Sequence, residues 1–134
     1  LQQSDFSYRE TYEFSRTLID QHPGLRAIWL QGSDRYQAAL DAIAEAGKQG
    51  EILLICFDAE PEFLAMIARG QLAGAGMQQP FLIGEKAVET MDLHLRGENV
   101  ERIQQLSVLA VSSDNINELL PVIKRNVLGK EAAR

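Results

Sequence analysis

The chain has 134 residues, a length typical of one domain, and 46% of them are hydrophobic while 24% are charged. This composition excludes a disordered, collagen-like or coiled-coil protein. The formal net charge of −6 argues against a nucleic-acid-binding surface, which needs clustered Lys and Arg. The longest apolar run, residues 52–57, is far shorter than the roughly 18 residues of a membrane-spanning helix. The single cysteine, Cys56, lies in this run, which predicts a buried thiol without a disulfide partner.

The first half of the chain alternates between helical and extended patterns. Residues 8–21 carry apolar side chains at helical spacing, and a Pro-Gly pair then stops the helix. Residues 26–30 form a short apolar strand, and Ser33 or Asp34 is predicted to cap a helix that ends near residue 46. Residues 51–57 are almost continuously apolar, which indicates a parallel strand covered on both faces.

The second half repeats the alternation. We predict a helix over residues 61–69, a strand over residues 72–77 and a long helix over residues 80–96. Residues 103–111 are extended, and Asp114 is predicted to cap the last helix. Strands separated by helices in this order predict an α/β fold, a parallel sheet flanked by helices.

Ligands of such sheets bind beyond the carboxyl ends of the strands. This rule selects the loops at residues 31–34, 58–60 and 78–79. Asp58, in the second of these loops, is a candidate to bind a ligand. It could instead cap the helix that follows it. Trp29 lies inside a strand, and packing in the core is the favoured interpretation of that side chain over stacking on a ligand.

Six short segments at these loops and the adjoining helices resemble the type I periplasmic binding proteins, the sugar-binding components of ABC importers. The matching segments occur in the family's order and spacing, and they are HPGLRAIW (22–29), QGSDRYQAAL (31–40), AIAEAG (42–47), ICFDAEP (55–61), GQLA (70–73) and QQPFLIGEKAV (78–88). The resemblance covers nearly the whole chain, and it implies a Rossmann-like lobe from the C-terminal half of such a protein. In this family two lobes close around a sugar by a hinge motion.

The resemblance assigns roles to individual residues. Asp58 looks like the aspartate that binds sugar hydroxyls, and Gln78 looks like the polar ligand residue beside the hinge, with a backbone hydrogen bond at the hinge as the alternative role. The family's ligand-binding asparagine falls at Gly32, which has no side chain to donate a hydrogen bond. Asp34 is therefore the expected substitute from the same loop, and Trp29 is a further candidate that could stack on the sugar.

The resemblance also divides the chain. Residues 1–78 and 110–134 would belong to the second lobe, and residues 80–109 would cross over into a first lobe. That first lobe is otherwise absent, so the two-lobe fold is incomplete in this chain. The apolar helix in that crossing segment would then lack its usual partner. We predict that it is covered in a homodimer, or that the chain is part of a longer protein.

The function implied is that of the solute-binding component of a sugar ABC importer, located in the periplasm and delivering its ligand to a membrane permease. No signal peptide is visible in the chain, and we expect that one was removed or belongs to a longer protein. No enzymatic activity, catalytic residue, metal or cofactor is predicted. The alternatives are the effector-binding core of a LacI-like transcription regulator and a sensor domain of the same fold.

Overall fold

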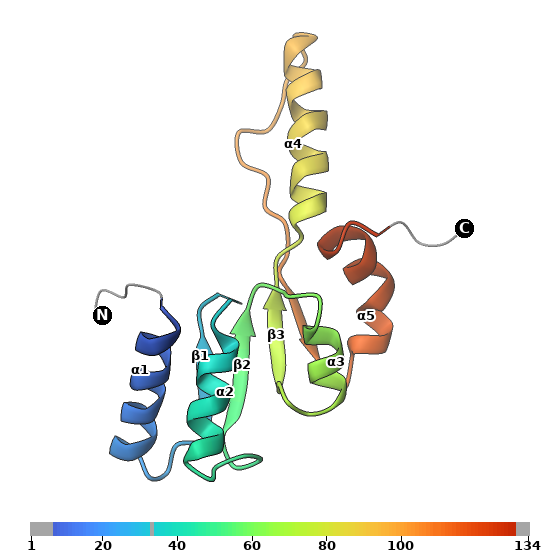
Figure 1. Ribbon diagram of the computed structural model, residues 1–134. Helices are drawn as coiled ribbons and strands as arrows, with labels where there is room; N and C mark the ends of the chain where they lie inside the picture. Colours follow the sequence, from blue (N-terminus) through green and yellow to red (C-terminus); the bar gives the residue numbers. More distant parts are fainter. Residues whose placement is uncertain (1–6, 33, 131–134) are drawn as a thin grey trace.

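The computed structural model describes residues 7–32 and 34–130. Five α-helices and four β-strands lie within them, and a π-helix extends the last α-helix (Figure 1). Their bounds are α1 Tyr8–Gln21, β1 Ala27–Leu30, α2 Tyr36–Glu45, β2 Leu53–Phe57, α3 Phe63–Ala68, β3 Gly74–Met77, α4 Pro80–Leu95, β4 Leu109–Ser112, α5 Ile116–Val122 and η1 Ile123–Val127. The predicted order of helices and strands is therefore confirmed.

The four strands form one sheet in the order β1-β2-β3-β4. Strands β1, β2 and β3 are parallel, but β4 is antiparallel to β3. The expectation of an entirely parallel sheet is wrong at this strand, although the α/β class is confirmed. The reason is the path of the chain: the segment after β3 leaves the sheet at the carboxyl end of β3 and returns to that same end, so β4 must run in the opposite direction.

The core occupies one face of the sheet. Strand side chains Leu54, Cys56 and Ala75 are buried there in one cluster with residues of α1, α2, α3 and α5. Right-handed crossovers that add strands in one direction place their helices on one face, which explains this arrangement. Cys56 is buried and free, so the predicted buried thiol without a disulfide partner is confirmed. This burial raises the pKa of the thiol to about 12.

The opposite face of the sheet, which we call the open sheet face, is formed by Trp29, Leu53, Ile55, Phe57 and Gly76. Trp29 is 60% exposed and Leu53 is 50% exposed. The expectations that β2 is covered on both faces and that Trp29 packs in the core are therefore wrong for the described residues. Alternation along a strand places these side chains opposite the helices, and the sequence of a short apolar strand does not reveal whether a second layer is present.

Two predicted helix caps also differ from the structure. Helix α2 has Arg35 as its N-cap residue, and Asp34 instead accepts a hydrogen bond from the Arg35 side chain at 3.3 Å. Ser33 lies outside the described residues. Helix α5 has Asn115 rather than Asp114 at its N-cap, because the Asn115 side chain is held by the backbone of β4 on both its oxygen and its nitrogen.

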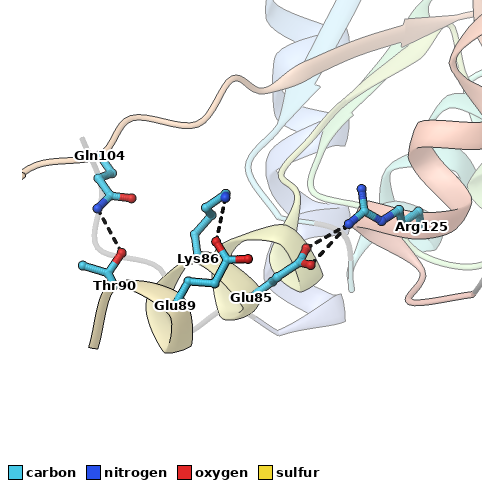
Figure 2. A network of polar contacts seen from close by, with 6 residues as sticks. All are labelled: Glu85, Lys86, Glu89, Thr90, Gln104 and Arg125. Carbon is cyan, nitrogen blue, oxygen red and sulfur yellow. Dashed lines mark hydrogen bonds and ion pairs between the residues drawn. The ribbon is translucent and has the colours of Figure 1, made fainter. Parts of the chain in front are cut away.

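Helix α4 and the segment that returns from it extend away from the sheet, and we call residues 80–108 the arm (Figure 1). Among the residues of α4 none is buried. The Gln104 amide donates to the Thr90 hydroxyl at 2.9 Å and so links the returning segment to the helix, as Figure 2 shows. Several large apolar side chains on the arm are exposed, namely Phe81, Ile83, Val88, Met91, Leu93, Leu95, Ile103 and Val108.

Within the part of the chain that the structure describes, no helix combines the length and the apolar character needed to cross a membrane.

Candidate functional site

The structure brings Asp58 and Gln78 together at the carboxyl edge of the sheet. Asp58 directly follows β2 and Gln78 directly follows β3, and these neighbouring strands are parallel. The side-chain amide of Gln78 donates a hydrogen bond to the Asp58 carboxylate at 2.6 Å. Two of the three loops selected from the sequence, at residues 58–60 and 78–79, therefore meet here, because the carboxyl ends of parallel neighbours lie at one edge.

Asp58 adopts a strained backbone conformation. Its φ of 69° makes it the one non-glycine residue with positive φ among the described residues. The Asp58 amide donates to the Gly76 carbonyl at 2.8 Å, which extends the pairing of β2 and β3 by one residue and fixes the turn. Such left-handed residues are concentrated at functional sites, where a side chain must point in a direction that ordinary backbone does not allow.

Asp58 is not the cap of the following helix. Helix α3 begins at Phe63, and its N-cap residue is Glu62, four residues after Asp58. The capping interpretation of Asp58 is therefore wrong. For Gln78, the observed hydrogen bond goes to a side chain and differs from the backbone bond weighed as its alternative role.

The remaining two predicted residues lie on the neighbouring strand or loop. Asp34 is exposed in the loop after β1, and its carboxylate pairs with Arg35 rather than with the Asp58–Gln78 pair. Trp29 lies one residue before the carboxyl end of β1, on the open sheet face. Its ring contacts Phe57 edge to face, with 6.4 Å between ring centroids and 63° between the planes.

Phe57 was not among the residues singled out from the sequence. It directly precedes Asp58, and its ring lies across Gly76 of β3, where an added Cβ would come within 3.1 Å of the ring. The signal was present in the strand's alternation, because Phe57 must face away from the buried Cys56. It was hidden in a run that contained only apolar residues.

This arrangement suits a neutral polyhydroxylated ligand. An ionised carboxylate accepts hydrogen bonds from two hydroxyls, and an amide both donates and accepts. The rings of Trp29 and Phe57 offer apolar surface at the same end of β1 and β2. Pairing with Gln78 orients the carboxylate in advance.

A separate hollow of about 610 Å³ lies between α2 and α3, lined by Tyr36, Leu40 and Arg69 among others, and none of the predicted site residues borders it. There the Tyr36 hydroxyl donates to the Glu62 carboxylate at 2.6 Å. This bond raises the pKa of Tyr36 to about 12 and lowers the pKa of Glu62. The pair holds α2 against the start of α3, which is a structural role.

Comparison with known proteins identifies relatives of this chain. The profile of a family described as "Periplasmic binding protein domain" matches residues 2–99. The ribose import binding protein of Escherichia coli (strain K12) is 33% identical over 100 residues, which are 75% of this chain and 33% of that protein. The ribose import binding protein of Bacillus subtilis (strain 168) is 34% identical over 101 residues, 75% of this chain and 32% of that protein.

A solved structure shares the fold. An ABC transporter solute-binding protein from Agrobacterium vitis, with bound α-D-tagatopyranose, superposes with a TM-score of 0.76 over 99% of this chain and 43% of that chain, at 18% identity. The chain spans about a third of the length of the two ribose import binding proteins that it matches.

Proposed function

Because the chain belongs to the periplasmic binding protein domain family, we propose that Asp58 and Gln78 form part of a sugar-binding site in the solute-binding component of an ABC importer. The observation that carries this proposal is the 2.6 Å hydrogen bond between them beside a left-handed Asp58. The conformation holds a carboxylate at the sheet edge where α/β proteins bind ligands. The named relatives are ribose import binding proteins, and we therefore propose a monosaccharide as the ligand of this chain.

The arm supports the two-lobe arrangement. It leaves the sheet after Gln79, two residues beyond the end of β3, and exposes its apolar side chains, as expected of a segment that completes another lobe. We therefore assign residues 1–78 and 110–134 to one lobe and residues 80–109 to the other. Closure of the lobes around the sugar would complete the contacts that Asp58 and Gln78 begin.

The location and partners follow from the same proposal. The protein would act in the periplasm and present its sugar to a membrane permease, and its net charge of −6 argues against a nucleic-acid partner. The relatives reported above are sugar-binding transport proteins and not enzymes, in agreement with the predicted absence of enzymatic activity. They favour transport over the LacI-like regulator considered as the alternative.

The single tryptophan offers a direct test, since Trp29 contacts Phe57 beside Asp58. Its fluorescence should change on titration with D-ribose, and the change should be lost in Asp58→Asn, which keeps the shape of the side chain but removes its charge. Asp114→Asn is the matched control, because Asp114 follows β4 at the opposite edge of the sheet. An unchanged affinity in Asp58→Asn would contradict the assigned role of the carboxylate.

A further inference from the structure

Three polar side chains are buried among the described residues, and Gln79, at 5% exposed, is the one that carries an amide; the other two are the hydroxyl residues Thr11 and Ser15. Gln79 lies between Gln78 of the candidate site and Pro80, the first residue of α4. Its side chain does not take part in the Asp58–Gln78 contact. A buried amide is costly unless both its nitrogen and its oxygen find partners, so its surroundings need an explanation.

Both ends of the Gln79 amide are satisfied by distant parts of the chain. The nitrogen donates to the Ser107 carbonyl at 2.8 Å, and the oxygen accepts from the Asn126 side chain at 2.7 Å. Ser107 lies in the returning segment just before β4, and Asn126 lies in η1. One side chain therefore joins the start of α4 and the returning segment of the arm to the terminal helix that packs on the sheet. We call the sheet with its packed helices the sheet domain.

The π-helical turn positions the Asn126 partner. In η1 the Leu128 amide bonds to the Ile123 carbonyl at 3.0 Å, the wider spacing of a π-turn. Ile123 and Val127 of this turn are buried, and they anchor the backbone on either side of Asn126. Such turns are rare within helices and commonly mark functional positions.

Two other contacts hold the base of the arm. The Arg125 guanidinium lies 3.2 Å from the Glu85 carboxylate, as Figure 2 shows, but both side chains are well exposed. Exposed ion pairs contribute little to the stability of a fold because water and salt screen the two charges. The Phe81 ring lies directly against Gly129, where no room remains for a Cβ. Of these contacts at the base of the arm, those of Gln79 are the polar ones made by a buried side chain.

We propose that Gln79 is a clamp that fixes the direction of the arm relative to the sheet domain and so positions the adjacent Gln78 against Asp58. A leucine of similar size would fill the space without joining the three segments. The two directional hydrogen bonds therefore determine one arm direction, whereas apolar packing alone would permit several. The consequence for sugar binding rests on the function proposed above, but the clamp itself does not.

The test is a distance measurement without ligand. Spin labels at Gln49→Cys, on the loop before β2, and at Glu98→Cys, beyond α4, place one exposed label on each side of the clamp. Cys56 can stay, because its buried thiol is protonated at neutral pH. The unaltered clamp should give one narrow distance distribution by pulsed electron spin resonance. Gln79→Leu and Asn126→Leu should each lose the single narrow peak.

Two further variants sharpen the outcome. Gln79→Glu keeps the acceptor for Asn126 but loses the donor to Ser107, so it should free the returning segment and partly broaden the distance distribution. Glu85→Gln removes only the exposed ion pair and should leave the distribution narrow. Should Gln79→Leu prevent folding, Asn126→Leu alone still decides. A narrow, unshifted peak in a folded leucine variant would overturn the clamp, whether or not the chain binds sugar.

Discussion

Asp58 combines backbone strain with a candidate ligand role, and the two can be separated by substitution. Asp58→Gly relieves the left-handed conformation, since glycine adopts positive φ without a steric penalty. We expect the free energy of unfolding to stay level or rise by up to about 1 kcal/mol, while sugar binding is lost. Urea unfolding and the Trp29 titration measure the two effects. A marked loss of stability would mean that the Asp58 side chain is mainly structural.

Cys56 gives the fold a dependence on alkaline pH. Its thiol has a pKa of about 12 in the folded state against the ordinary value of 9.0, so the unfolded chain releases the proton first. The unfolded state then binds fewer protons than the folded state, and stability falls as the pH rises through 9.0.

The free energy of unfolding should be lower at pH 10 than at pH 8 by about 1 kcal/mol, as one pH unit beyond the unfolded pKa implies. Urea unfolding at the two pH values measures this. Cys56→Ala should be less stable at both values but should lose this part of the slope. An equal slope in the variant would assign the effect to other groups, such as the tyrosines.

The pairing of β3 with β4 depends on a close approach at Gly74. A Cβ at this position would lie 2.6 Å from the Val111 carbonyl oxygen, at the end of the ladder where Gly74 pairs with Ser112. Gly74→Ala should therefore lower the free energy of unfolding by about 1–3 kcal/mol, the usual range for overpacking. The change should be read from denaturant unfolding, with hydrogen exchange at the β4 amides as a local measure.

Gly84→Ala is the matched control for this substitution. Gly84 lies in α4, and an added Cβ would meet nothing within 4 Å. Alanine favours the helix over glycine, so stability should rise by up to about 1 kcal/mol. If both substitutions had the same effect, the close contact at Gly74 would not explain the result.

Patterns along single helices and strands were enough to predict most of the fold. Helix α1 and the two strands β1 and β2 occur where periodicity placed them, because local spacing determines which side chains can share a face. The direction of β4 could not be predicted, since it depends on where the arm returns to the sheet. Trp29 was misplaced for a similar reason: its burial depends on a second layer that a strand's own sequence does not encode.

The candidate site was predicted in part. Parallel strand ends and the family motifs together selected Asp58 and Gln78, and the structure joins them. Asp34 was chosen to replace an absent asparagine, and it pairs with Arg35. Gln79 lay in a selected loop, but its hydrogen bonds could not be predicted because its partners, Ser107 and Asn126, are 28 and 47 residues away in sequence.

The exposed apolar side of the arm makes association of two copies a testable prediction. Val88 is 72% exposed and Leu95 is 77% exposed on the same helix. If a homodimer covers residues 80–109, light scattering after size exclusion should give twice the 14.9 kDa of one chain. Combined Val88→Lys and Leu95→Lys substitutions should return it to a single chain, whereas Leu53→Lys on the open sheet face should not. A mass of 14.9 kDa for the unaltered chain would contradict the predicted homodimer.

The measurement that tests the central claim most directly is a ¹H–¹⁵N correlation titration of the chain with D-ribose. We predict saturable shifts that centre on the backbone amides of Phe57, Asp58 and Gln78 and on the side-chain amide of Gln78, and that disappear in Asp58→Asn. Binding should be weak, since half of the proposed contacts belong to the other lobe. Shifts centred on the hollow between α2 and α3 would contradict the proposed site. So would a complete lack of shifts with each of the three sugars D-ribose, D-allose and D-galactose.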